Sequence, residues 1–186
     1  VDDYISLGNN YKYTDELFVS VEAYMDDWSL YGNKRLLSCT EGGGWNFETV
    51  YRGGANDGTS SLEYISFTVY DAGSQSYRYS SSHTTKWADL SAGWHTFVGS
   101  FDGEYARLYV DGQLLAVSSR FVGDIGYSGN NSILVGAEAY LYDEPDSSYR
   151  YFKGKMRNVY IANASVSTDS IYSPAPTDSV GYSGIH

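Results

Sequence analysis

The sequence predicts an all-β protein made of antiparallel strands, and three observations lead to this prediction. Turn-forming pairs such as Asp57-Gly58, Asp102-Gly103 and Asp111-Gly112 recur at short intervals, each followed by a short run of strand-forming residues. Between the turns, apolar and polar residues alternate with the period of two that places successive side chains on opposite faces of a sheet. With 186 residues, 42% of them hydrophobic, the chain has the size of a β-sandwich with one core.

The clearest strand is expected at residues 17–25. Its odd positions are all apolar and should face the core, whereas Ser20, Glu22 and Tyr24 point the other way. Residues 107–115 indicate a hairpin of two strands joined by a tight Asp-Gly turn. Further strands are expected at residues 4–7, 45–51, 62–70, 77–82, 95–101, 133–139 and 155–162.

No segment shows the sustained periodicity of a helix, so the chain is predicted to form one layered β domain. Residues 1–173 are assigned to this single ligand-binding domain. Residues 174–186 are polar and contain proline, which indicates a C-terminal tail or a linker stub.

The charge and composition of the chain exclude some classes of partner. A formal net charge of −11, with only 12 Lys and Arg, argues against nucleic acid and anionic membranes. No 18-residue apolar span is present, so membrane insertion is not expected. The 20 Tyr, together with many Ser, Gly and Asn, favour a surface adapted to recognition, which makes a binding protein plausible.

Cys39 is the only cysteine, so an internal disulfide is excluded, and its apolar neighbours predict a buried thiol. The chain begins at Val1, and no basic and apolar signal segment opens it. We therefore interpret it as a module of a longer protein, tethered to other modules. Its acidity and aromatic surface favour an extracellular, secreted or cell-surface location.

Three stretches together resemble the laminin G-like and pentraxin families. Residues 17–24 are similar to a core strand of the form F-T-hydrophobic-S. The most specific stretch is Trp94-His95 through Asp102-Gly103, followed by the L-Y-V-D-G hairpin of residues 108–112. Residues 133–136 and 152–161 look like the closing strands I-x-x-G and F-x-G-x-hydrophobic-x-x-V.

The resemblance covers residues 17–167 and implies a concanavalin A-like jelly roll, in which two curved antiparallel sheets pack face to face. It also implies a carbohydrate-binding or adhesion module of a larger extracellular protein. This implication is an analogy at the level of the fold, so the function has to be argued from a site.

The resemblance to pentraxins implies a calcium site, for which Asn46 and Glu138 match two ligands. Trp45 stands where the family has an Asp, so one charged ligand is lost unless Asp143 or its acidic neighbours replace it. The alternative is that this acidic loop is solvated and binds nothing specific. We therefore expect that no cofactor is required, and calcium stays open.

A glycan or polysaccharide site is expected on the concave face, through aromatic and carboxylate residues. Trp45 follows three glycines and could offer a flat platform for a sugar ring, with Glu41, Glu22 and Tyr24 as companions that accept hydrogen bonds from hydroxyls. The alternative for Trp45 is a packing residue beneath a loop.

Three further residues are candidates for ligand binding. Trp28 and Tyr31 follow an acidic pair in a predicted loop, where aromatic residues can signal recognition. His83 lies in a Ser-rich segment and could line the site. His95, by contrast, matches a family strand position and is expected to be packed and hydrogen-bonded.

No catalytic motif is present. The E-x-D-x-x-E strand motif of jelly-roll glucanases is absent, and so is the G-x-S-x-G elbow of serine hydrolases. The sequence thus predicts a non-catalytic, lectin-like domain that binds a glycan. An adhesion or protein-interaction domain is the alternative, and a glycoside hydrolase domain is less favoured.

Overall fold

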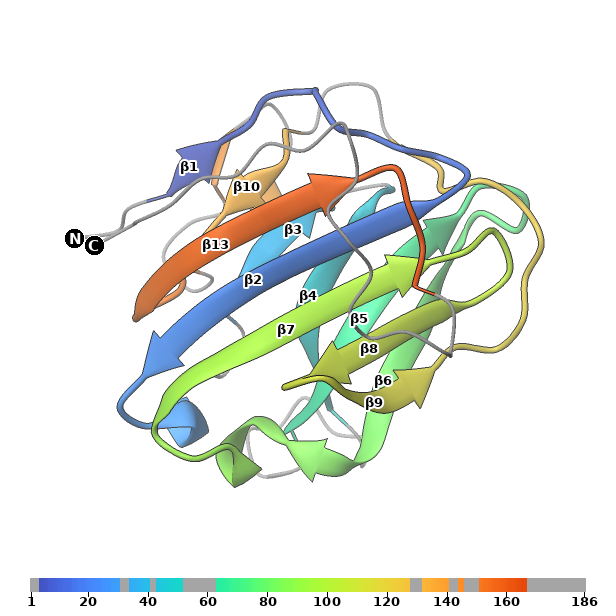
Figure 1. Cartoon of the computed structure of the whole chain (residues 1–186). Helices are drawn as coiled ribbons and strands as arrows, with labels where there is room; N and C mark the ends of the chain where they lie inside the picture. Colours follow the sequence, from blue (N-terminus) through green and yellow to red (C-terminus); the bar gives the residue numbers. More distant parts are fainter. Residues whose placement is uncertain are drawn as a thin grey trace.

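The computed structural model places two antiparallel sheets face to face (Figure 1), which confirms the predicted all-β sandwich. It describes residues 4–30, 34–40, 43–51, 63–127, 132–140, 144–145 and 151–166, with the backbone alone at ten positions. No helix in this part of the chain has the length and apolar character needed to cross a membrane.

The six-stranded sheet has the order β1-β10-β3-β4-β5-β6, and all its neighbouring strands pair antiparallel. Its strands are β1 (Ile5–Ser6), β10 (Leu134–Val135), β3 (Leu37–Cys39), β4 (Trp45–Tyr51), β5 (Glu63–Asp71) and β6 (Ser76–Lys86).

The five-stranded sheet has the order β13-β2-β7-β8-β9 and lies in front of the first in Figure 1. Its strands are β13 (Lys155–Ala162), β2 (Leu17–Met25), β7 (Gly93–Phe101), β8 (Ala106–Val110) and β9 (Gln113–Val117). A separate two-stranded pair joins β11 (Ala139–Tyr140) to β12 (Glu144–Pro145).

The predicted strands exist with ends shifted by a few residues, except that the strand expected at residues 133–139 was wrong. The chain turns at Gly136, which has a φ of 84°, so this stretch forms only β10 and β11, which lie in different sheets. Strands β3 and β12 were not predicted, because two or three residues are too short to show a period of two. Two single turns of 3-10 helix, η1 (Trp28–Leu30) and η2 (Trp87–Asp89), pack together at one end of the sandwich.

The core lies between the two sheets and follows the alternation of the strands. In β2 every odd position is buried and every even position is partly exposed, as the sequence predicted. The centre of the core is aromatic, and Phe47 from β4 packs on Phe67 from β5 at a centroid distance of 5.1 Å. Cys39 points into this core, and burial raises the pKa of its thiol to about 12, so it stays protonated and inert.

The two sheets approach each other closely at Gly99 of β7. A Cβ atom on Gly99 would overlap the ring of Phe67 in the opposite sheet. Because interiors are close-packed, neither sheet can give way here without moving a whole strand. Gly99 therefore fixes the spacing of the sheets at this point.

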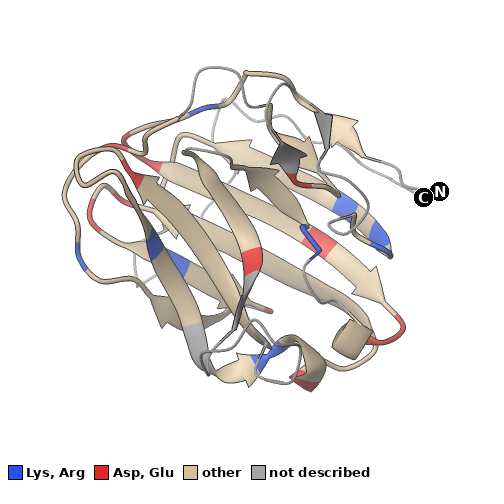
Figure 2. Cartoon of the chain, turned by 180° about the vertical axis from the view of Figure 1, so that it is seen from behind, with Lys and Arg blue, Asp and Glu red and all other residues tan. Residues whose placement is uncertain are grey.

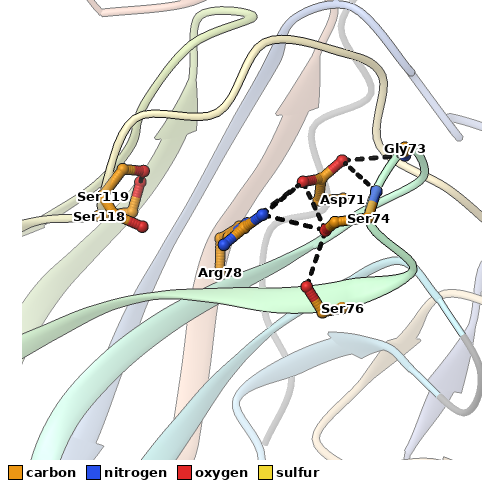
Figure 3. A network of polar contacts seen from close by, with 7 residues as sticks. All are labelled: Asp71, Gly73, Ser74, Ser76, Arg78, Ser118 and Ser119. Carbon is orange, nitrogen blue, oxygen red and sulfur yellow. Dashed lines mark hydrogen bonds and ion pairs between the residues drawn. The ribbon is translucent and has the colours of Figure 1, made fainter.

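The turn between β5 and β6 is held by the buried carboxylate of Asp71 (Figure 3). Its Oδ1 atom accepts hydrogen bonds from the backbone N–H groups of Gly73 and Ser74, at 2.9 and 3.2 Å. Its Oδ2 atom accepts a hydrogen bond from the Ser74 hydroxyl at 2.7 Å and forms an ion pair with Arg78 at 2.9 Å. The Ser74 hydroxyl, followed by Arg78 and the backbone groups, lowers the pKa of Asp71 from 3.8 to about 2.

We predict that Gly99→Ala lowers the free energy of unfolding by about 1–3 kcal/mol, because the added methyl group overpacks the space beside Phe67. The measurement is urea unfolding at pH 7. Gly73→Ala in the exposed β5–β6 turn is the matched control and should cost less, since its Cβ atom would meet only the Asp71 carboxylate, at 3.3 Å. Equal losses for the two variants would contradict this account of sheet spacing.

We predict that Asp71→Asn costs stability at neutral pH and that the cost disappears in acid. Because the folded-state pKa of Asp71 is depressed from 3.8 to about 2, its contribution is complete above pH 3.8 and is lost as pH falls towards 2. The turn is partly solvated, so screening limits the contribution to roughly 1 kcal/mol.

The measurement is urea unfolding of both proteins at pH 7, 3.5 and 2. Glu104→Gln, which removes one partner of the exposed Arg120–Glu104 ion pair, serves as the control and should show little difference at any pH. A stability gap between wild type and Asp71→Asn that stays constant from pH 7 to pH 2 would contradict the prediction.

Candidate functional site

The outer face of the six-stranded sheet carries polar side chains in consecutive rows. In β4, Trp45 and Phe47 point into the core, so Asn46 and Glu48 point outwards. The same alternation in β5 turns Ser66 and Thr68 outwards, where they lie opposite Glu48 and Asn46 respectively. Figure 2 shows this side of the molecule, with charged residues sparse on the strands and more frequent at their ends.

Arg35 lies between two carboxylates on this face. Its Nη2 atom lies 3.2 Å from Oε1 of Glu138 and 3.5 Å from Oε2 of Glu48, and all three side chains are mostly buried. Thr40 donates a hydrogen bond to the same Glu138 oxygen at 3.2 Å, and Thr68 donates one to Oε1 of Glu48. We call these five residues, together with Asn46, the polar cluster.

Asn46 completes the polar cluster and is only 3% exposed. It lies between Ser38 of β3 and Thr68 of β5, which are its pairing partners in the sheet. Within the described residues, its side-chain oxygen has no hydrogen-bond partner. A buried acceptor of this kind is costly unless a donor reaches it, so it marks a place where a ligand or a water can bind.

A row of tyrosines leads away from the polar cluster along β5 and β6. The rings of Tyr70 and Tyr77 lie 5.0 Å apart and those of Tyr77 and Tyr79 lie 6.5 Å apart. Tyr79 is 50% exposed and pairs across the sheet with Thr68, which binds Glu48. Partial burial and the negative charge of Glu48 raise the pKa of Tyr79, so its phenol stays neutral. We call these three residues the tyrosine row.

The prediction that Trp45 offers an exposed platform for a sugar ring was wrong. The indole is completely buried and packs against Phe67 at 6.5 Å, because Trp45 has the same phase in β4 as the core residue Phe47. The alternative, that Trp45 is a packing residue, agrees with this burial.

The prediction that Trp28 is an exposed residue for ligand recognition was also wrong. Trp28 lies in η1, is 1% exposed, and stacks on Trp87 at a centroid distance of 5.9 Å. Its Nε1 atom donates a hydrogen bond to the carbonyl oxygen of Gly93 at 3.3 Å. Trp28 therefore closes the end of the core where η1 meets η2.

Glu22 and Tyr24 lie on the outer face of the other sheet, so the structure does not bring them together with Asn46 or Glu48. Glu22 accepts hydrogen bonds from Asn158 at 2.7 Å and from Arg157 at 2.6 Å. The Asn158 bond, followed by the bond and charge of Arg157, lowers the pKa of Glu22. The Arg157 guanidinium also lies 4.1 Å above the ring of Trp94.

A bulge in β13 creates this second cluster. The pairing of β13 with β2 shifts between Arg157 and Tyr160, and Asn158 has a φ of 52°. Two successive side chains, Arg157 and Asn158, can therefore reach one carboxylate, that of Glu22. We call Glu22, Tyr24, Trp94, Arg157 and Asn158 the β13 clasp; it binds the edge strand to the sheet.

The remaining predicted residues cannot be placed. Glu41, Tyr31 and Asp143 lie outside the described residues, and so do the neighbours of Asp143 except the backbone of Glu144. His83 lies in β6, the strand that carries Tyr79, but only its backbone is described.

His95 is packed and hydrogen-bonded, as predicted. Its Nδ1 atom lies 2.6 Å from Oδ2 of Asp111, and its Nε2 atom lies 2.8 Å from the carbonyl oxygen of Ser91 and 3.5 Å from the Ser91 hydroxyl. The sequence of contacts from Asp111 to His95 to Ser91 resembles the triad of a serine hydrolase. The nearer partner of Nε2 is the Ser91 carbonyl oxygen, at 2.8 Å, and not the hydroxyl, at 3.5 Å, so the contact that activates a serine nucleophile is not formed. This arrangement fastens two turns together.

The calcium site implied by the family resemblance does not fit the described residues. Glu138, which would supply a carboxylate, already receives the Arg35 guanidinium and the Thr40 hydroxyl on Oε1, so a cation on either of its oxygens would lie beside the positive charge of Arg35. Trp45, in the place of the family's Asp, points into the core. Among the described side chains, no group of three His, Cys, Asp or Glu could hold a metal ion.

Comparisons with known proteins agree with the fold. Residues 1–172 match the family described as the concanavalin A-like lectin/glucanases superfamily. Among curated protein sequences, none matches this chain.

Several solved structures are similar to this one. Domains LG4-5 of the mouse laminin α1 chain are 19% identical, with a TM-score of 0.59, over 88% of this chain and 40% of that chain. A candidate carbohydrate-binding protein from Bacteroides ovatus is 17% identical, with a TM-score of 0.59, over 88% and 42%. Domain 4 of AbnA, a GH43 extracellular arabinanase from Geobacillus stearothermophilus in complex with arabinotriose, is 14% identical, with a TM-score of 0.55, over 90% and 70%. This chain thus spans less than half of the first two.

We predict that Trp45→Ala lowers the free energy of unfolding by about 3–5 kcal/mol, because it empties a fully buried site. Tyr79→Ala, which changes a half-exposed ring, should cost much less. Urea unfolding monitored by circular dichroism measures both. A loss for Trp45→Ala below 1 kcal/mol would contradict its burial in the core.

Proposed function

Because the chain belongs to the concanavalin A-like lectin/glucanases superfamily, we propose that it is a non-catalytic domain that binds a glycan on the outer face of its six-stranded sheet. The observation that carries the proposal is the position of the half-exposed Tyr79 beside Glu48 and Thr68. The binding residues would be Tyr79 and Glu48, with Tyr77 and Asn46 as neighbours.

The chemistry of this face suits sugars. A sugar ring presents an apolar face that can pack on an aromatic ring, and hydroxyl groups that donate hydrogen bonds. Tyr79 offers the ring, while the partly exposed carboxylate of Glu48 offers an acceptor. The ion pair with Arg35 and the bond from Thr68 fix the carboxylate of Glu48 before a ligand arrives, which reduces the entropy cost of binding.

The β13 clasp is a weaker candidate for the same function. Its carboxylate already accepts bonds from Arg157 and Asn158, so it has less capacity for ligand hydroxyls. Its exposed ring, Trp94, lies under the Arg157 guanidinium. It nevertheless provides a control surface for experiments, because it is on the opposite sheet.

The proposal of a non-catalytic role rests on the same ion pairs. A glycoside hydrolase needs one carboxylic acid that carries a proton and a second carboxylate across the scissile bond. The Arg35 guanidinium lies within 3.5 Å of an oxygen of both Glu48 and Glu138, so these two carboxylates are tied to one cation and do not face each other across a space for a scissile bond. The similar domain from the arabinanase binds arabinotriose in its structure, which supports a sugar ligand for a domain of this fold.

We further propose that the domain is an extracellular module of a larger protein. The net charge of −11 and the sugar-binding face suit that setting, and the similar laminin and Bacteroides chains are more than twice as long as the part this chain matches. The proposed partner is therefore a polysaccharide outside the cell.

The function is tested by screening the purified domain against polysaccharides and a glycan array, followed by calorimetry on the best hit. We expect Tyr79→Ala and Glu48→Gln each to weaken binding about tenfold, since a stacking or charged hydrogen-bond contact is worth on the order of 1.4 kcal/mol.

Trp94→Ala, an exposed aromatic on the opposite sheet, is the matched control and should bind as wild type does. Binding that is lost with Trp94→Ala but kept with Tyr79→Ala would move the site to the β13 clasp. If no glycan binds, the proposal fails, and a protein partner at the exposed Leu114 and Val117 of edge strand β9 becomes the better explanation.

A further inference from the structure

The polar cluster buries charges of both signs under the outer face of the six-stranded sheet. The side chains of Arg35, Glu48 and Glu138 are 8%, 17% and 4% exposed. Two carboxylates this deeply buried and this close together repel each other unless a positive charge lies between them. The position of the Arg35 guanidinium, within 3.5 Å of an oxygen of each, supplies that charge.

We infer that Arg35 takes the place of a bound cation in this domain, so that the fold and its outer face do not depend on calcium. The guanidinium joins Glu48 on β4 to Glu138, which follows β10. These two segments are distant in sequence. A metal ion that binds one carboxylate oxygen from each could join them in the same way. Here the chain supplies the positive charge itself.

A calcium ion on Glu138 would compete with Arg35. Calcium binds oxygens at about 2.3–2.6 Å, so an ion on Oε1 of Glu138, the oxygen that Arg35 contacts, would lie within about 6 Å of the guanidinium nitrogen. An ion on Oε2, for which no hydrogen bond is found within the described residues, would lie only slightly farther from the same charge, because both oxygens belong to one carboxylate. The repulsion between a doubly charged ion and a guanidinium is strong in a partly buried place. The same oxygen also receives the Thr40 hydroxyl, which would have to leave it.

Without Arg35, the carboxylates of Glu48 and Glu138 could form part of a cation site. Glu138, Glu48 and the side-chain oxygen of Asn46 are hard oxygen ligands of the kind that calcium prefers. The buried Asn46 oxygen has no hydrogen-bond partner within the described residues, so it is free to bind. A variant without the guanidinium should therefore bind calcium and be stabilised by it, whereas the wild-type protein should not.

The experiment measures the melting temperature of wild type, Arg35→Gln and Arg35→Lys, each in 5 mM EDTA and in 5 mM calcium chloride. We expect wild type to melt at the same temperature in both. Arg35→Gln should melt about 10 °C lower in EDTA, because it removes the positive charge that lies within 3.5 Å of two buried carboxylates, and calcium should restore several degrees. Arg35→Lys keeps the positive charge and should show no response to calcium.

A wild-type protein that is stabilised by calcium, or that binds it in calorimetry, would overturn the inference. So would Arg35→Gln with the wild-type melting temperature, or with a lowered one that calcium leaves unchanged. Should Arg35→Gln fail to fold, the pair of wild type and Arg35→Lys still decides: any calcium response in either overturns the inference, and its absence in both supports it. No glycan is used, so failure here is separate from failure of the proposed function.

Discussion

The architecture depends on the constraint that each strand of a sandwich has only one face to give to the core. In the six-stranded sheet that constraint assigns Trp45, Phe47 and Phe67 to the interior, because they share one phase of the alternation. The opposite phase is left for Asn46, Glu48 and Thr68. The proposed binding face is thus built from the positions that the core cannot use, and the two cannot be changed independently.

The close approach of the sheets at Gly99 strengthens the constraint. Phe67 fills the space that a side chain at Gly99 would need, so the sheets cannot slide or separate without opening a cavity. The rigid core holds the backbone of β4 and β5 in place, and with it the spacing between Glu48 and Tyr79. A recognition face on strands gains its precision from this support, whereas one on loops would have to be ordered when the ligand binds.

The sequence predicted the parts of the molecule that depend on local patterns. The alternation in residues 17–25 and the Asp-Gly hairpin after Tyr109 were both confirmed, because each is decided within a few residues. The same alternation, applied to Trp45-Asn46-Phe47-Glu48, could have shown that Trp45 shares the phase of Phe47 and faces inwards. The contact of Arg35 with Glu138 joins residues 103 apart and leaves no local signal. Only the pairing of β10 with β3 and of β3 with β4 brings these residues to the same face.

The polar cluster shows how the outer face accommodates charged side chains although much of it is buried. Buried charges are tolerated when each has a partner, and Arg35 provides one for both Glu48 and Glu138. Because Arg35 and Thr68 hold the Glu48 carboxylate, a hydroxyl that approaches Tyr79 would meet an acceptor already in position. A neutral ligand rich in hydroxyls can donate to Glu48 and Asn46 without bringing a further negative charge beside two carboxylates. An acidic ligand would add that repulsion, so the electrostatics of this face favour an uncharged sugar.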